Sequence, residues 1–151
     1  MLDLENASID AYFNGLVSLA QPKGSLKAGL DSLLLAASLK LKPEHKILDL
    51  GCGCFQLGLF LLARHPDICV LGIENQFKLV EFAQYNIKTA NESSRCHVSQ
   101  SDILKGSLNE VRSNSFDHVI SNPPYFSYKP ETELSTTHQE RRLARGFKIG
   151  R

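Results

Sequence analysis

The sequence predicts an α/β fold built on an open parallel sheet. Short apolar runs alternate with amphipathic helical stretches from residue 46 to residue 121, which is typical of βαβ units. These runs also end in polar residues, as strands do where open α/β sheets bind ligands. Finally, 151 residues with 42% hydrophobic content allow one domain and leave no room for a second.

The first part of the chain is predicted to be helical. Apolar residues recur at helical spacing over Ile9–Leu19, and Gln21-Pro22-Lys23-Gly24 then breaks the pattern. A second helix is expected over Leu30–Leu41, where Asp31 suits the N-terminal dipole. We therefore expect a helical segment over residues 1–43, ahead of the sheet.

The rest of the predicted domain consists of βα units and a basic tail. The strands are expected at Lys46–Leu50, Cys69–Glu74, Cys96–Asp102 and Phe116–Ser121, with helices at Leu57–Arg64, Phe77–Thr89 and Thr137–Arg145. The single domain, 1–151, is thus divided into the helical segment, ligand-binding βα units over 46–126 and a tail over 138–151.

Composition excludes several classes of protein. No apolar run approaches the ~20 residues of a membrane span, and the acidic N-terminus lacks the order of a secretory signal. The 4 cysteines form no C-x-x-C pair, so we expect reduced thiols and no metal site in a cytoplasmic protein. The net charge of +1 does not by itself indicate a nucleic-acid partner.

The first predicted strand leads into a glycine-rich loop at the edge where parallel strands present their carboxyl ends. Asp49 lies near the end of this strand, and Gly51 and Gly53 follow it. Glycines let the backbone approach a ligand closely and expose amide N–H groups. Alone, such a loop is a weak indication of a cofactor site.

The next two strands add acids at the same edge. Glu74 can accept hydrogen bonds from a ribose diol. Asp102 can accept from an adenine amino group, while Ile103 can cover the ring. Each acid alone is more often a solvated strand end, but together in successive βα units they predict a cofactor that contains adenosine.

The fourth strand runs into Asn122-Pro123-Pro124-Tyr125. Two consecutive prolines make this corner rigid and unable to extend the sheet. The Asn122 amide oxygen and the Pro123 carbonyl are two acceptors that can hold a planar amino group and free its lone pair for attack. Tyr125 offers a face on which a base can stack. The alternative, a plain surface turn, fits poorly with the acids on the preceding strands.

Together, these motifs resemble those of the class I S-adenosylmethionine-dependent methyltransferases that modify planar nitrogens. The resemblance implies a Rossmann-like doubly wound parallel sheet with S-adenosylmethionine as cofactor. It also implies the following roles: Asp49, Gly51 and Gly53 near the methionine part of the cofactor, Glu74 at the ribose, Asp102 and Ile103 at the adenine, and Asn122, Pro123, Pro124 and Tyr125 around the target nitrogen.

The flanking residues narrow the resemblance. Gln21–Gly24, Ala28–Ala37 and Phe126 look like the corresponding parts of the bacterial tRNA1(Val) adenine-37 N6-methyltransferase family. The resemblance implies methyl transfer to the exocyclic N6 of an adenine in tRNA. Two alternatives stay open: a glutamine methyltransferase for a release factor, and an inactive remnant that binds nucleoside or RNA without catalysis.

Two departures from the family pattern motivate the last alternative. Phe55 stands where the family loop usually has glycine, which predicts weak cofactor binding, a re-routed loop or an inactive site. In addition, only the first four strands of the family fold can be found, so the C-terminal strands are missing. The fourth strand would then be an open edge available for self-association.

The tail is locally basic. From His138 to Arg151 there are five basic residues against one acid, a local charge of +4. These side chains either contact RNA phosphates, with an affinity that falls as salt rises, or form a solvated helix face.

Overall fold

The computed structural model describes residues 2–24, 29–105, 108 and 111–123. Its centre is a parallel sheet in the order β5-β4-β3-β6, formed by β3 (Lys46–Leu50), β4 (Cys69–Glu74), β5 (Cys96–Gln100) and β6 (His118–Ile120). The predicted α/β fold with a parallel sheet is therefore confirmed. β5 and β6 are shorter than expected, since Asp102 and Ser121 lie beyond their ends.

Three helices accompany the sheet: α1 (Leu30–Ser38), α2 (Gln56–Arg64) and α3 (Phe77–Thr89). α3 has the predicted bounds, α2 begins one residue early and α1 ends before the expected Leu41. α3 packs against β4 and β5, and α1 packs against α2. The predicted helix over Thr137–Arg145 and the basic tail lie outside the described residues.

The predicted helix over Ile9–Leu19 is wrong. This stretch forms an antiparallel hairpin of β1 (Ala7–Tyr12) and β2 (Val17–Pro22), joined by a short 3-10 turn at Phe13–Gly15. Within the described part of residues 1–43, α1 is thus the one α-helix.

The hairpin has a clear physical cause. The turn residues Phe13, Asn14 and Gly15 have φ values of 53°, 55° and 88°, and an Asn-Gly pair at positive φ is a strong hairpin signal. Ile9 and Leu16, which the helical spacing placed on a buried face, are 63% and 70% exposed. The 3.6-residue spacing was therefore coincidental.

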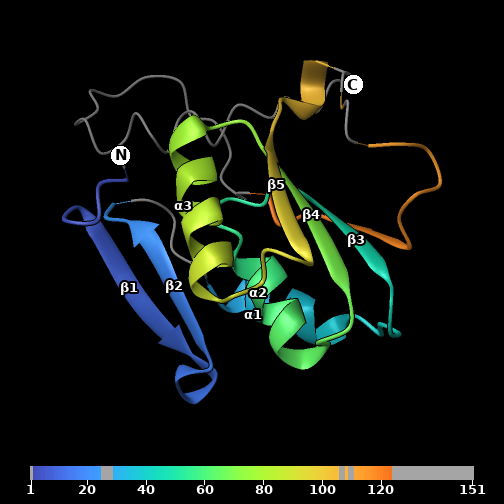
Figure 1. Ribbon diagram of the computed structural model, residues 1–151, viewed down its shortest axis with the longest axis horizontal. Helices are drawn as coiled ribbons and strands as arrows, with labels where there is room; N and C mark the ends of the chain where they lie inside the picture. Colours follow the sequence, from blue (N-terminus) through green and yellow to red (C-terminus); the bar gives the residue numbers. More distant parts are fainter. Residues whose placement is uncertain (1, 25–28, 106–107, 109–110, 124–151) are drawn as a thin grey trace.

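The main core lies between the sheet, the helices and β2. Figure 1 shows α3 between the hairpin and the sheet, in agreement with its contacts to β2 and β5. Fully buried apolar side chains come from each of these layers, including Leu19 of β2, Ile47 of β3, Phe60 of α2 and Phe82 of α3. On β6, Val119 is 62% exposed, and self-association along this strand stays a prediction.

Candidate active site

The carboxyl ends of the parallel strands meet at one edge of the sheet. Asp49 of β3 is in register with Gly72 of β4 on one side and with Ile120 of β6 on the other. Because β6 ends at Ile120, Asn122 follows close to the end of β3. The loop after β3 and the corner after β6 are therefore neighbours, as the topology of the predicted fold requires.

The glycine loop after β3 turns back over the end of β4. Gly51 and Gly53 have φ values of 74° and 57°, which favour glycine. The backbone N–H groups of Gly51 and Cys52 donate to the Ile73 carbonyl at 2.8 and 3.0 Å. A Cβ at Gly51 would meet nothing within 4 Å, so open space adjoins the loop there.

Glu74 ties this loop to the start of α3. Its Oε2 accepts the Gly53 N–H at 3.0 Å, and its Oε1 accepts the N–H groups of Asn75 and Gln76, both at 2.9 Å. The carboxylate therefore holds the two residues that lead into α3, which begins at Phe77. This double structural role was not predicted from the sequence.

Asp49 is a buried acid, with 1% of its surface exposed. Burial, followed by the charge of Glu74, raises the pKa of Asp49 to about 7. Its Oδ2 is buried and accepts no hydrogen bond from the residues that the structure describes. An orphaned carboxylate oxygen at a ligand-binding edge is the partner that a cationic ligand group requires.

Asp102 and Ile103 lie just past β5, where a 3-10 turn begins (η2, Ile103–Lys105). Asp102 Oδ1 accepts the Leu104 N–H at 3.0 Å, which fixes the carboxylate at the turn. Both residues are half-buried. The structure thus places this predicted adenine site beside Glu74, whose backbone carbonyl accepts the Ser101 N–H at 2.9 Å.

The corner after β6 is held by two side-chain hydrogen bonds. Ser121 Oγ donates to the Leu50 carbonyl at 2.8 Å, and Asn122 Nδ2 donates to Ser32 Oγ of α1 at 2.9 Å. Pro123 is exposed. The other two residues of the predicted corner, Pro124 and Tyr125, lie outside the described residues.

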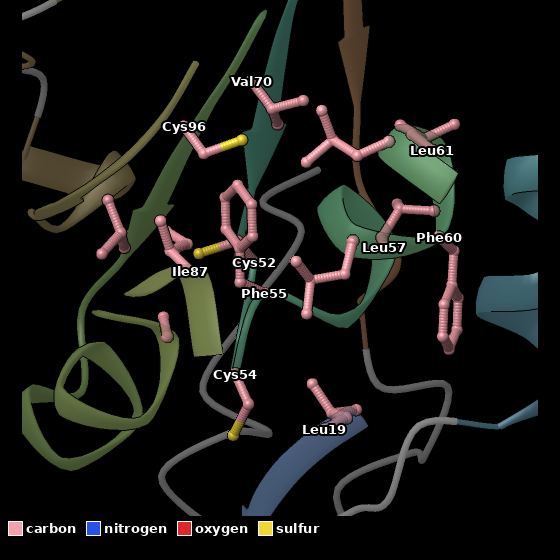
Figure 2. Packing of buried hydrophobic residues seen from close by; sticks show 14 of the residues in the cluster. Leu19, Cys52, Cys54, Phe55, Leu57, Phe60, Leu61, Val70, Ile87 and Cys96 are labelled. Atoms are coloured by element: carbon pink, nitrogen blue, oxygen red, sulfur yellow. The ribbon is translucent and has the colours of Figure 1, made fainter. Parts of the chain in front are cut away.

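Phe55 does not occupy the ligand side of the loop. Its backbone adopts φ 70° and ψ 25°, the conformation for which glycine is the usual residue, and its side chain is 0% exposed. Figure 2 shows the ring in the core near Cys52 and Ile87. A Cβ at Gly72 would lie 3.0 Å from Phe55 Cδ2, so the ring uses room that this glycine leaves.

Asn86 of α3 is a structural residue that the sequence analysis missed. Its side chain is 1% exposed; Nδ2 donates to the carbonyls of Ala20 and Cys54, both at 2.9 Å, and Oδ1 accepts the Ala20 N–H at 2.8 Å. It thereby joins β2 to the cofactor-type loop. A signal existed: Asn86 is a polar residue four positions after the apolar Phe82, on the buried face of α3.

Three of the four cysteines are core residues. Cys52, Cys54 and Cys96 are buried and Cys69 is exposed, all as free thiols. Burial raises the pKa of Cys54 and of Cys96 to about 12, so neither is a reactive thiolate at neutral pH. Across the part of the chain that the structure describes, no three metal-ligating side chains are grouped, and no helix is long and apolar enough to cross a membrane.

Known proteins are similar to this chain in sequence. A tRNA1(Val) (adenine(37)-N6)-methyltransferase of Yersinia enterocolitica is 29% identical over 110 residues, which are 72% of this chain and 43% of that protein. A Yersinia pestis protein of the same name is also 29% identical, over 44% of its length. The chain therefore spans less than half the length of these curated relatives.

The solved structures confirm the fold. An S-adenosylmethionine-dependent methyltransferase from Geobacter sulfurreducens, in complex with S-adenosylhomocysteine, matches 60% of this chain and 35% of its own, with a TM-score of 0.51 and 22% identity. A precorrin-6y C5,15-methyltransferase from Geobacter metallireducens matches 68% of this chain and 53% of its own, with a TM-score of 0.57 and 14% identity.

A family model matches most of the chain. The family described as methyltransferase small domain matches residues 26–144, which include α1, the whole parallel sheet and the corner after β6. This match agrees with the predicted class I fold and with S-adenosylmethionine as the cofactor that the sequence predicts. The chain belongs to the methyltransferase small domain family.

Proposed function

We propose that this chain forms the cofactor-binding and catalytic part of an S-adenosylmethionine-dependent methyltransferase that acts on the N6 amino group of an adenine in tRNA. One observation carries the proposal: Ser121 Oγ fastens the corner before Asn122 to the Leu50 carbonyl, immediately before the glycine loop. A methyl acceptor held at Asn122 and a methyl donor on that loop would therefore be adjacent.

The residues at the loop fit S-adenosylmethionine. The orphaned Asp49 Oδ2 suits the ammonium of its methionine part, and the open space at Gly51 lets that part approach the backbone. Glu74 already accepts three N–H groups, and a carboxylate accepts about four hydrogen bonds. Accepting both ribose hydroxyls would therefore require Glu74 to give up one of these three contacts. Asp102 and Ile103, just past β5, would contact the adenine.

The proposed reaction needs little chemistry from the protein. When bound, S-adenosylmethionine would supply an electrophilic methyl group on a sulfonium. The amine lone pair would form the new N–C bond as the C–S electron pair leaves with sulfur, and the nitrogen would then release its proton to water. The Asn122 amide oxygen and the Pro123 carbonyl accept from the amino group and orient its lone pair. Such alignment of two reactants supplies much of the acceleration in enzymes of this kind.

Two observations support tRNA as the substrate. The Yersinia relatives carry that activity in their names, and the predicted Asn-Pro-Pro-Tyr corner suits a base whose amino edge is turned outward and whose ring stacks on Tyr125. The five basic side chains of the tail, beyond the described residues, would then contact RNA phosphates.

The proposal is tested with purified chain, tritiated S-adenosylmethionine and unmodified valine tRNA. Wild type should label the tRNA, Asn122→Ala should lose at least ~100-fold of the rate, and Asn6→Ala, an exposed asparagine paired with Asp3, should behave as wild type. Equal labelling by wild type and Asn122→Ala overturns the assignment. Labelling of a release factor instead of tRNA would favour the glutamine substrate. Binding of S-adenosylhomocysteine without any transfer would indicate a non-catalytic binding domain.

A further inference from the structure

Ser32, a residue of α1, has a buried polar side chain. It is 1% exposed, and its Oγ accepts a hydrogen bond from Asn122 Nδ2 at 2.9 Å. The two residues are 90 positions apart in sequence. α1 therefore contacts Asn122 in the corner after β6, where the proposed function locates the target amine.

The contact determines which way the Asn122 amide faces. An amide carries a nitrogen that only donates and an oxygen that only accepts, on two branches of one planar group. Because Ser32 Oγ accepts from the nitrogen branch, the oxygen branch points in another direction than Ser32 Oγ. A rotation of the amide by half a turn would present a donor instead, and a donor repels the N–H groups of an amine.

We propose that Ser32 is a positioning residue that sets the polarity of the methyl-acceptor site: it keeps Asn122 Oδ1 as an acceptor and so selects an amino group over a carbonyl or ring-nitrogen acceptor. This inference rests on the proposed function and deepens it. In this proposal Ser32 acts through Asn122.

α1 is anchored well enough to act in this way. Ala36, one turn after Ser32, is 1% exposed, and its carbonyl accepts a hydrogen bond from Arg64 Nη1 at the end of α2. Leu30 and Leu34 on the other side of α1 are 67% and 57% exposed. The side of α1 that carries Ser32 is thus packed against α2. This packing fixes the position of the Ser32 hydroxyl.

The test uses Ser32→Ala, which removes the acceptor, Ser32→Thr, which keeps it, and Ser38→Ala as the matched control. Ser38 lies at the exposed end of the same helix and its hydroxyl donates to the Leu35 carbonyl. With tRNA as substrate, Ser32→Ala should lower kcat roughly 10-fold, as expected for one lost hydrogen bond. Ser32→Thr should recover most of the rate and Ser38→Ala should match wild type, while all three bind S-adenosylhomocysteine with wild-type affinity.

A second measurement does not depend on activity. Proton exchange of the Asn122 side-chain amide, followed by NMR on the full chain, should be slow in wild type and in Ser38→Ala and at least roughly 5-fold faster in Ser32→Ala. Exchange that is equally fast in wild type and Ser32→Ala overturns the contact itself. Unchanged kcat in Ser32→Ala overturns the positioning role while the proposed function stands. Absence of transfer by wild type, by contrast, refutes the proposed function and with it the role of Ser32 in catalysis.

Discussion

Replacing Asp49 by asparagine should stabilise the protein and weaken cofactor binding at the same time. The substitution keeps the shape of the side chain and removes its charge. In the folded chain burial raises the pKa of Asp49 to about 7, against an ordinary value of 3.8. The difference is about 3 pH units, and at 1.36 kcal/mol per unit the ionised carboxylate costs on the order of 4 kcal/mol of folding stability.

The sign of the effect sets its pH window. A folded-state pKa above the unfolded value means that the native state binds more protons between pH 3.8 and about 7. Stability from this group is therefore present at low pH and falls as pH rises through that window. Asp49→Asn should equal wild type near pH 4 and exceed it at pH 8 by roughly 8–16 °C in Tm, at about 2–4 °C per kcal/mol.

The assay compares melting curves of wild type and Asp49→Asn from pH 4 to pH 8, with calorimetry of S-adenosylhomocysteine at each pH. Loss of the charged partner should weaken binding by roughly 10- to 100-fold, and wild-type binding should weaken below pH 7 for the same reason. The matched control is Asp117→Asn. The exposed Asp117 accepts the Lys46 N–H at 2.8 Å, which lowers its pKa, so its replacement should lower the Tm. A Tm gain for Asp49→Asn that does not depend on pH would refute the reasoning.

Two further substitutions test the architecture around the loop. Phe55→Gly relieves about 1–2 kcal/mol of strain at φ 70° but deletes a fully buried ring that contributes about 3–5 kcal/mol, so urea unfolding should show a net loss of about 2–3 kcal/mol; an equal or higher midpoint would contradict this balance. Asn86→Ala leaves the Ala20 N–H without its side-chain acceptor, so stability should fall by about 1–3 kcal/mol and the Ala20 amide should exchange faster by hydrogen-exchange NMR; unchanged exchange would show that Asn86 does not hold β2.

The sheet and its two crossover helices could be predicted because their signals are local. Lys46–Leu50 and Cys69–Glu74 are apolar runs of strand length, and Phe77–Thr89 has an unbroken helical period, so each element is visible in its own residues. The hairpin has a local signal as well, the Asn14-Gly15 pair, but the helical spacing of the flanking apolar residues outweighed it. Its residues at helical spacing mimic an amphipathic helix, and the edge of β2 is completed by Asn86, which lies 66 positions after Ala20.

The positions of the candidate-site residues could be predicted from the sequence, but their hydrogen-bond partners could not. Once the strands are parallel, Asp49, Glu74 and Asn122 must reach one edge. What each carboxylate and amide contacts depends on register and on loop path, so the sequence does not reveal that Glu74 accepts the Gly53 N–H or that Asn122 donates to Ser32. Nor does it show that Asp49 Oδ2 has no hydrogen-bond partner among the described residues.

Phe55 shows why a departure from a family motif must be judged with its neighbours. Taken alone, a phenylalanine at a glycine position predicts a ring in the ligand site. Here the backbone keeps the left-handed conformation that glycine would adopt, and the ring points into the core, where Gly58 and Gly72 carry no side chains to obstruct it. The bulk at Phe55 is accommodated by missing bulk at Gly58 and Gly72, and its effect on cofactor binding stays a prediction.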